Sequence, residues 1–253
     1  NRARILSEIR TFFNAQDFVE VDTPVIVTAP APEPHIEAAE IKLDLPKGQV
    51  TRYLQTSPEL PMKRLLAEGL ERIFQIAPVF RQADFSPTHR PEFRMLEWYR
   101  CGASWEILLE DCETLLRTCA KAVLGEPTIR FGNALIDLNK DFRRITMDEA
   151  FLEHAGFSIL EQLEPGSLQD KLDELSIHHH SSDTWDDLFH RVFLDKVEPA
   201  LLKDPTPLFL THYPAPLAAL ARRSPSDPRA SERFELYVAG IELANGFGEL
   251  TCP

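Results

Sequence analysis

Apolar residues recur at helical spacing in two parts of the chain. Ile5, Ile9 and Phe12 share one helical face and predict a first helix that ends near Asn14. From about residue 105 to residue 203 the pattern is mostly of the same kind, and we expect these helices to pack on a sheet.

A helix start is marked in the segment TSPELPMKRLLAEGL, residues 56–70. Ser57 is a good N-cap residue, and Pro58 fits the first helical position because its missing N–H is not needed there. Glu59 would meet the positive end of the helix dipole. The sequence therefore predicts a helix that begins at Pro58.

Strand character and turn residues fill much of the remainder. The proline-rich segment 23–35 predicts a long surface loop. Runs typical of strands occupy residues 18–26, 72–81, 91–100, 207–214 and 232–250. The second and third of these runs predict an antiparallel hairpin with a long polar tip. Strands, then helices, then strands favour an α+β fold with a mainly antiparallel β-sheet flanked by helices.

Composition is that of a folded protein. With 253 residues and 43% hydrophobic content, the chain can form one large domain with a substantial core. No apolar run has the length of a membrane span, and the first helix is amphipathic rather than a secretory leader. Four cysteines without a CxxC pair indicate reduced thiols. We expect a cytoplasmic protein that does not contact membranes.

The charge balance bears on partners. A net charge of −13 argues against nonspecific nucleic-acid binding, which a basic surface favours through counterion release. A local basic patch stays compatible with this balance.

In PEFRMLEWYR, residues 91–100, a period of two places Phe93, Met95, Glu97 and Tyr99 on one strand face. An aromatic ring, a carboxylate and a phenol in line could bind a flat ring and a cation. A half-buried strand with Glu97 paired to an arginine explains the same pattern.

The segment ERFELYVAGIELANGFGEL, residues 232–250, reads as a second hairpin. If Ala239 and Gly240 form a two-residue turn, Tyr237 faces Glu242, and Glu235 lies on the same face as a diagonal neighbour. Two converging carboxylates repel each other unless a cation lies between them, and Mg²⁺ accepts such oxygen ligands. Solvated glutamates on an exposed face are the alternative.

The same register pairs Glu235 with Ala244 and sends Glu249 to the opposite face. A β-bulge at Asn245 or Gly246 would return Glu249 to the face of the other carboxylates.

Taken together, these segments resemble the catalytic core of class II aminoacyl-tRNA synthetases, and within them the lysyl-tRNA synthetase group. FVEVDTPVI resembles motif 1, VFRQADFSPTHRPEFRMLEWYR resembles motif 2, and the second hairpin resembles the segment that binds lysine and metal. TSPELPMKRLL and THYPAPLAALA are further landmarks. The resemblance implies one class II catalytic domain over residues 1–253.

Within that group the chain is most similar to the elongation factor P lysine ligases, truncated paralogues that attach (R)-β-lysine to a lysine of elongation factor P. The chain begins one helix before motif 1, so we expect no anticodon-binding domain. Ala244 stands where the tRNA enzymes have glycine. A methyl group in a pocket floor changes selectivity by about 1 to 3 kcal/mol.

The resemblance implies roles for individual residues. Arg81 would bind the α-phosphate of the cosubstrate ATP as the catalytic arginine, His89 would reach the terminal phosphates, and Phe93 would stack on adenine. Glu235 and Glu242 would hold Mg²⁺. The pocket for lysine or (R)-β-lysine would be lined by Glu59, Glu97, Tyr99, Ala244, Asn245, Phe247 and Glu249, the last of which would meet the side-chain ammonium. Elongation factor P would be the acceptor rather than tRNA, and the protein would be a homodimer.

The sequence departs from the family pattern at three places. Ala83, followed by Asp84, stands where motif 2 has glutamate, and Arg90 replaces an asparagine. The chain also ends before a motif 3 segment. Two other hypotheses therefore stay open, namely the charging of tRNA and a noncatalytic paralogue that binds an amino acid or a nucleotide.

Other polar and aromatic residues indicate structure rather than a site. The histidines at 178–180 predict a polar loop, because no acidic or cysteine partner stands at ligand spacing. Trp98 and Trp105 predict packing, and Cys101 and Cys112 have no base beside them in sequence.

Overall fold

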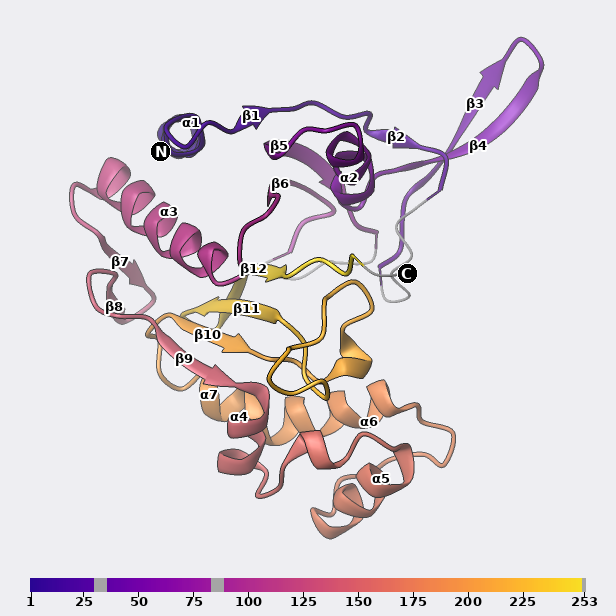
Figure 1. Ribbon diagram of the computed structural model, residues 1–253, viewed down its shortest axis with the longest axis vertical. Coiled ribbons are helices and arrows are strands. Elements are labelled where there is room, and N and C mark those ends of the chain that lie inside the picture. Colours follow the sequence, from indigo (N-terminus) through magenta and orange to yellow (C-terminus); the bar gives the residue numbers. More distant parts are fainter. Residues whose placement is uncertain (30–35, 83–88, 252–253) are drawn as a thin grey trace. The chain divides into compact units, whose positions relative to one another are not determined.

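The computed structural model describes residues 1–29, 36–82 and 89–251. They form two compact units, one of residues 9–103 and one of residues 1–8 with 104–253. Both units combine helices with sheets in which antiparallel pairs predominate, so the α+β class is confirmed (Figure 1). The expectation of a single domain stays a prediction.

The unit of residues 9–103 is built on two three-stranded sheets, β1-β5-β6 and β2-β4-β3. The hairpin of β5 and β6 is antiparallel as predicted, whereas β1 pairs with β5 in parallel. The elements are α1 (Arg2–Asn14, which crosses the boundary of the units), β1 (Val19–Glu20), β2 (Ile26–Val27), β3 (Glu40–Leu45), β4 (Gly48–Leu54), α2 (Glu59–Ala67), β5 (Arg72–Phe80) and β6 (Glu92–Arg100).

Helices cover both faces of the sheet β1-β5-β6. Met62 of α2 packs with Ile73 and Tyr99 on one face. On the other face Phe13 of α1 is fully buried and stacks on Phe74 at 4.6 Å between ring centres. The first helix therefore ends where the periodicity predicts, with its last aromatic residue in the core.

Two expectations for this unit are corrected. Strand β2 lies inside the segment 23–35 that was expected to be a loop, of which residues 30–35 fall outside the described part. Helix α2 begins at Glu59, one residue later than expected, although the Ser57 hydroxyl still accepts a hydrogen bond from the Glu59 amide at 3.1 Å. The exposed hairpin of β3 and β4 was not predicted (Figure 1).

The other unit contains a four-stranded sheet of order β12-β11-β10-β9, in which β9 and β10 are parallel and the other neighbours antiparallel. In the described part of the chain no helix is long and apolar enough to cross a membrane. The elements are α3 (Ile107–Leu124), β7 (Thr128–Phe131), β8 (Ala134–Asp137), β9 (Arg143–Thr146), α4 (Met147–His154), the 3₁₀ turn η1 (Ile159–Glu161), α5 (Pro165–Glu174), α6 (Trp185–Val192), the π-helical turn η2 (Phe193–Val197), α7 (Glu198–Leu201), β10 (Leu208–Thr211), the 3₁₀ turn η3 (Ala215–Leu217), β11 (Arg233–Val238) and β12 (Ile241–Phe247).

This sheet lies between two helical layers. Helices α4 to α7 gather on one side, where Leu208, Leu210 and Tyr237 of the sheet join their core (Figure 1). On the other side Trp105, just before α3, stacks on Phe234 of β11 with ring centres 6.2 Å apart. The predicted arrangement of helices on a sheet is thus confirmed, and Trp105 is a packing residue as expected.

Three short strands interrupt the segment 105–203, which was expected to be mostly helical. Strands β7 and β8 form a hairpin, and β9 joins the sheet beside β10. Helix α4 then begins with a capping box, in which the Thr146 side chain accepts from the Glu149 amide and the Glu149 side chain accepts from the Thr146 amide. Strands of four residues carry too little periodicity to be separated from neighbouring helices by sequence.

The cysteines provide a test of the packing. Cys101 is exposed and Cys112 is buried in α3, and both are free thiols. Burial, reinforced by Asp111 and Glu113, raises the pKa of Cys112 to about 12. At pH 8 only on the order of 1 in 10⁴ of its thiols is then ionised. Iodoacetamide should alkylate Cys101 in the native protein and leave Cys112 unmodified, as judged by peptide mass mapping. Equal labelling of both would contradict the packing of α3.

Candidate functional site

The C-terminal hairpin begins with the predicted turn. Ala239 and Gly240 both have positive φ, at 50° and 78°, which is the requirement of the two-residue turns that suit the twist of a hairpin. Tyr237 lies opposite Glu242, as predicted. This end of the register follows from local turn chemistry.

Two glycines fix the register at the other end. A methyl group on Gly246 would lie 2.6 Å from the Phe234 ring, and one on Gly248 would lie 2.4 Å from a carboxylate oxygen of Glu232. Phe234 is 1% exposed and Glu232 is 6% exposed, so neither can yield easily. Only glycine fits against these two side chains.

A β-bulge follows from these two constraints. Between the fixed ends, β11 supplies five residues from Phe234 to Val238, and β12 supplies six from Ile241 to Gly246. The extra residue is Leu243, which is left without a cross-strand partner and is 51% exposed. The predicted bulge is therefore confirmed, but its expected position at Asn245 or Gly246 is wrong.

The bulge also changes the predicted pairing. Glu235 lies opposite Asn245 rather than Ala244, which instead pairs with Leu236. One face of the hairpin, here called the carboxylate face, therefore carries Arg233, Glu235, Tyr237, Glu242, Asn245 and Phe247. Glu249 follows with the same alternation, since Gly248 lies against Glu232 on the opposite face.

Ala244 has a different position from the one expected. Its partner Leu236 belongs to the face opposite to Glu235, and the Ala244 side chain shares that face. The suggestion that Ala244 lines the amino-acid pocket therefore rests on the resemblance alone.

Glu235 is buried, and both oxygens of its carboxylate accept hydrogen bonds. Its side chain is at the edge of the helical layer, and the residue is 8% exposed. Arg233 donates to Oε1 at 2.7 Å, and the Tyr237 hydroxyl donates to Oε2 at 2.6 Å. Asn245 Nδ2 lies 3.5 Å from Oε1. Glu242, by contrast, is exposed on the edge strand β12.

Arg233 was missed by the sequence reasoning. It stands two residues before Glu235, so the period of two already placed it on the same face. The argument that the two carboxylates require a bound cation is corrected accordingly, because Arg233 provides a cation beside Glu235.

The carboxylate face nevertheless fits Mg²⁺. No group of three or more metal-binding side chains occurs within the described residues. Magnesium does not need one, because it keeps several waters and is held by one or two carboxylates together with substrate phosphates. Glu235 and Glu242 supply two such oxygen donors from one face, and both raise the pKa of Tyr237, which lies between them.

Two tyrosines, Tyr237 and Tyr213, lie close to the negative charge of Glu235. Burial, together with Glu235, raises the pKa of Tyr237 and Tyr213 well above the ordinary value for a phenol. The pKa of Glu198 in α7 is also raised, by burial and then by Glu235. The Tyr213 hydroxyl lies near Glu235 but has no hydrogen-bond partner of normal geometry among the residues that the structure describes. Both tyrosines therefore stay protonated and neutral at physiological pH.

In the unit of residues 9–103, strand β6 carries the other predicted site residues. Its alternation is confirmed by the register, which pairs Phe93 with Val79, Glu97 with Gln75, and Tyr99 with Ile73. Glu97 is half-buried, whereas Tyr99 is 8% exposed at the α2 end of the strand. Trp98, on the other face, lies 5.7 Å from the Phe13 ring, and its predicted packing role is confirmed. Strand β6 therefore brings Phe93, Glu97 and Tyr99 to one sheet face.

Arg81 follows β5 directly and contacts Phe93. Its guanidinium carbon lies 5.5 Å from the ring centre, and Nε donates to the Thr56 carbonyl at 3.4 Å. His89 is exposed and lies three residues before the start of β6. Ala83 and Asp84, the departures in motif 2, lie outside the described residues. The predicted arginine and the predicted aromatic residue are thus neighbours within this unit.

Glu59 is held at the start of α2. Its carboxylate forms an ion pair with Lys63 one turn later, at 2.6 Å, and the side chain is 15% exposed. A substrate ammonium would have to displace Lys63 from the Glu59 carboxylate or share the carboxylate with it. The positions of the predicted site residues are thus known within each unit, and their roles stay predictions.

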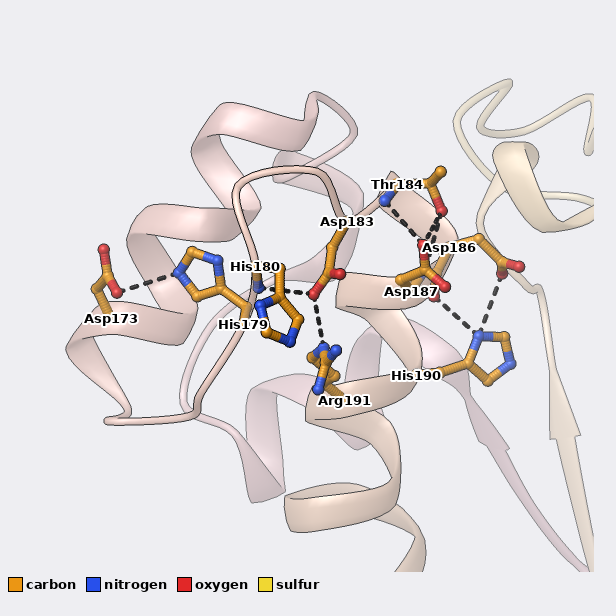
Figure 2. A network of polar contacts seen from close by, with 9 residues as sticks. All are labelled: Asp173, His179, His180, Asp183, Thr184, Asp186, Asp187, His190 and Arg191. Carbon is orange, nitrogen blue, oxygen red and sulfur yellow. Dashed lines mark hydrogen bonds and ion pairs between the residues drawn. The ribbon is translucent and has the colours of Figure 1, made fainter.

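The histidines at 178–180 form a loop between α5 and α6, as predicted (Figure 2). His179 forms an ion pair with Asp173, six residues earlier, at 3.1 Å, a contact that the sequence analysis did not predict (Figure 2). Asp183 instead accepts from the His180 amide at 2.9 Å and from Arg191 at 2.8 Å (Figure 2). These contacts fasten the loop to α6. Among the described residues, no three histidine, cysteine or acidic side chains lie close enough together to bind a metal ion.

Comparison with known proteins identifies the family. The pattern of the tRNA synthetases class II (D, K and N) matches residues 1–253. The chain belongs to this family. Curated relatives similar to it are the lysine–tRNA ligase of Actinobacillus pleuropneumoniae serotype 5b, 35% identical over 98% of the chain and 49% of the relative, and that of Xylella fastidiosa strain 9a5c, 36% identical over 100% and 49%. The lysine–tRNA ligase of Psychromonas ingrahamii is 36% identical over 98% and 48%.

The resemblance to class II synthetases is thereby confirmed for the family of the D, K and N enzymes, and the relatives named above are lysine–tRNA ligases. The chain spans about half the length of these curated relatives. The narrower similarity to elongation factor P lysine ligases stays a prediction.

Proposed function

We propose that this class II synthetase chain activates lysine or (R)-β-lysine with ATP and transfers it to a lysine of elongation factor P. In the first step a carboxylate oxygen of the amino acid attacks the α-phosphorus of ATP. The bond to the β-phosphate breaks, and pyrophosphate leaves. The product of the first step is a mixed anhydride of the amino acid and AMP. In the second step the acceptor amine attacks the carbonyl carbon of this anhydride and loses a proton, and AMP leaves. No enzyme nucleophile is needed, because positioning and charge stabilisation supply the catalysis.

The residues divide between the two substrates. Arg81 and His89 bind phosphates, Arg81 stabilises charge on the α-phosphoryl group, and Phe93 stacks on adenine. The resemblance assigns contacts with the amino acid to Glu59, Glu97 and Tyr99 in one unit and to Ala244, Asn245 and Phe247 in the other. It assigns the contact with the side-chain ammonium to Glu249. Glu235 and Glu242 would hold Mg²⁺, which would supply neutralisation of phosphate charge and Lewis acidity.

One observation carries the proposal. The bulge at Leu243 brings Glu235, Glu242 and Asn245 to a single face, with Phe247 and Glu249 continuing it. A face that carries carboxylates and an amide suits an amino acid with two ammonium groups. It also suits a metal ion bound to the phosphate chain of ATP. The curated relatives of this chain, which are named lysine–tRNA ligases, support the same proposal.

Amino-acid-dependent exchange of pyrophosphate into ATP tests the first step. We expect exchange with lysine or with (R)-β-lysine, and none without an amino acid. A noncatalytic protein that only binds these ligands would give no exchange with either.

The acceptor has two candidates. The names of the relatives favour the tRNA alternative. The net charge of −13 argues only against nonspecific binding to RNA and does not decide between the two acceptors. A competition with purified elongation factor P and lysine tRNA distinguishes them. Labelled amino acid on elongation factor P supports the proposal, and label on tRNA alone contradicts it.

The resemblance in motif 1 also supports a homodimer, which sedimentation equilibrium of the purified chain would test. The cytoplasmic location stays a prediction.

A further inference from the structure

Arg233 is fixed by three contacts. One guanidinium nitrogen donates to the Leu217 carbonyl at 2.8 Å, and the other donates to Glu235 Oε1 at 2.7 Å. The guanidinium carbon also lies 4.3 Å from the centre of the Tyr213 ring. A planar group held at both edges and one face cannot turn, so its bond to Glu235 has a fixed direction.

The Tyr237 hydroxyl holds the other oxygen of Glu235, at 2.6 Å. The tyrosine is 7% exposed and packs in the core of the helical layer, which fixes the ring. The Glu235 carboxylate therefore lies between two rigid donors and cannot rotate without losing a hydrogen bond. Oε2, with Tyr237 as its donor, keeps a further lone pair for another ligand, whereas Oε1 also has Asn245 Nδ2 at 3.5 Å.

We propose that Arg233 and Tyr237 are positioning residues that hold Glu235 in one orientation for the Mg²⁺ of the activation step. The inference rests on the function proposed above. A glutamate that is already ordered loses no side-chain freedom when it binds a metal ion. Hydrogen bonds from an outer shell to a ligating group change metal affinity by about 10-fold to 100-fold.

Glu232, directly before the same strand, forms a matched pair with Arg222 that does not face the site. Arg222 contacts Glu232 at 2.7 and 2.8 Å, and Glu232 is 6% exposed, much like Glu235. Glu232 lies on the opposite face of the hairpin, against Gly248. A change at Arg222 therefore tests what the loss of an arginine–glutamate pair does to the fold alone.

Tyr213 provides the second control. Its buried hydroxyl lies near Glu235, yet no described residue accepts or donates a hydrogen bond of normal geometry to it. Tyr213→Phe and Tyr237→Phe each remove one oxygen atom close to Glu235. Only the second removes a hydrogen bond of normal geometry to the carboxylate.

The test measures Mn²⁺ binding by the full chain with a non-hydrolysable ATP analogue, from the paramagnetic resonance signal of free Mn²⁺. Arg233→Lys and Tyr237→Phe are expected to weaken Mn²⁺ binding by about 10-fold to 100-fold. Arg222→Lys and Tyr213→Phe are expected to leave it unchanged. Circular dichroism verifies the fold, and Tyr237→Phe alone carries the test if Arg233→Lys does not fold.

Wild-type affinity in both site variants would overturn the inference, as would an equal loss in the two controls. Absence of Mn²⁺ binding in the unaltered protein would also overturn it. Exchange activity is measured in parallel on the unaltered chain. If it is present while Mn²⁺ affinity does not respond to Arg233 or Tyr237, the positioning role fails and the proposed function stands.

Discussion

Arg81→Ala is expected to lower amino-acid-dependent ATP–pyrophosphate exchange by about 10²-fold to 10³-fold. The guanidinium is proposed to bind the phosphoryl group at which charge develops, and one such contact in a desolvated site has this magnitude. Arg81 is positioned by the end of β5, where its amide donates to the Pro91 carbonyl at 3.0 Å and its side chain lies over Phe93. Alanine keeps the backbone bond and removes only the side-chain contacts.

Arg72→Ala is the matched control. Arg72 begins the same strand and donates to the Gln16 carbonyl at 3.1 Å on an exposed surface. Its loss should leave exchange near the wild-type rate, since an exposed hydrogen bond contributes about 1 kcal/mol or less to stability. Equal losses in both variants would assign Arg81 a structural role. Full exchange activity of Arg81→Ala would remove the arginine from the mechanism.

Gly246→Ala is expected to destabilise the fold by about 2 to 3 kcal/mol, because the new methyl group overlaps a packed ring. It would lie 2.6 and 2.7 Å from two ring carbons of Phe234. That ring cannot move away, since it is held between Trp105 and Phe209. The melting temperature should fall by about 5 to 10 °C, measured by calorimetry.

Gly166→Ala shows what the same substitution does where space is available. Gly166 lies near the start of α5, and a methyl group there meets no atom of the described residues within 4 Å. Alanine favours a helix over glycine, so stability should be unchanged or rise by about 0.5 to 1 kcal/mol. A Gly246→Ala protein as stable as wild type would mean that β12 does not lie against Phe234. The register that forms the carboxylate face would then be wrong.

The sequence by itself determined the features that depend on neighbouring residues. Helical periodicity located α1, and alternation with a polar tip gave the hairpin of β5 and β6. The pair Ala239 and Gly240 indicated a two-residue turn, which fixed Tyr237 opposite Glu242. The motifs were sufficient to identify a class II synthetase of the D, K and N family. Each of these inferences needs only spacing or turn chemistry over a few residues.

Only the tertiary structure decided where the alternation breaks and what Glu235 contacts. The bulge falls at Leu243 because the glycine at 246 must lie against Phe234, a ring that Trp105 and Phe209 hold in place. The burial of Glu235 between Arg233 and Tyr237 likewise depends on the layer of helices that covers one face of the sheet. Such constraints arise from packing between segments far apart in the chain, so no local pattern encodes them.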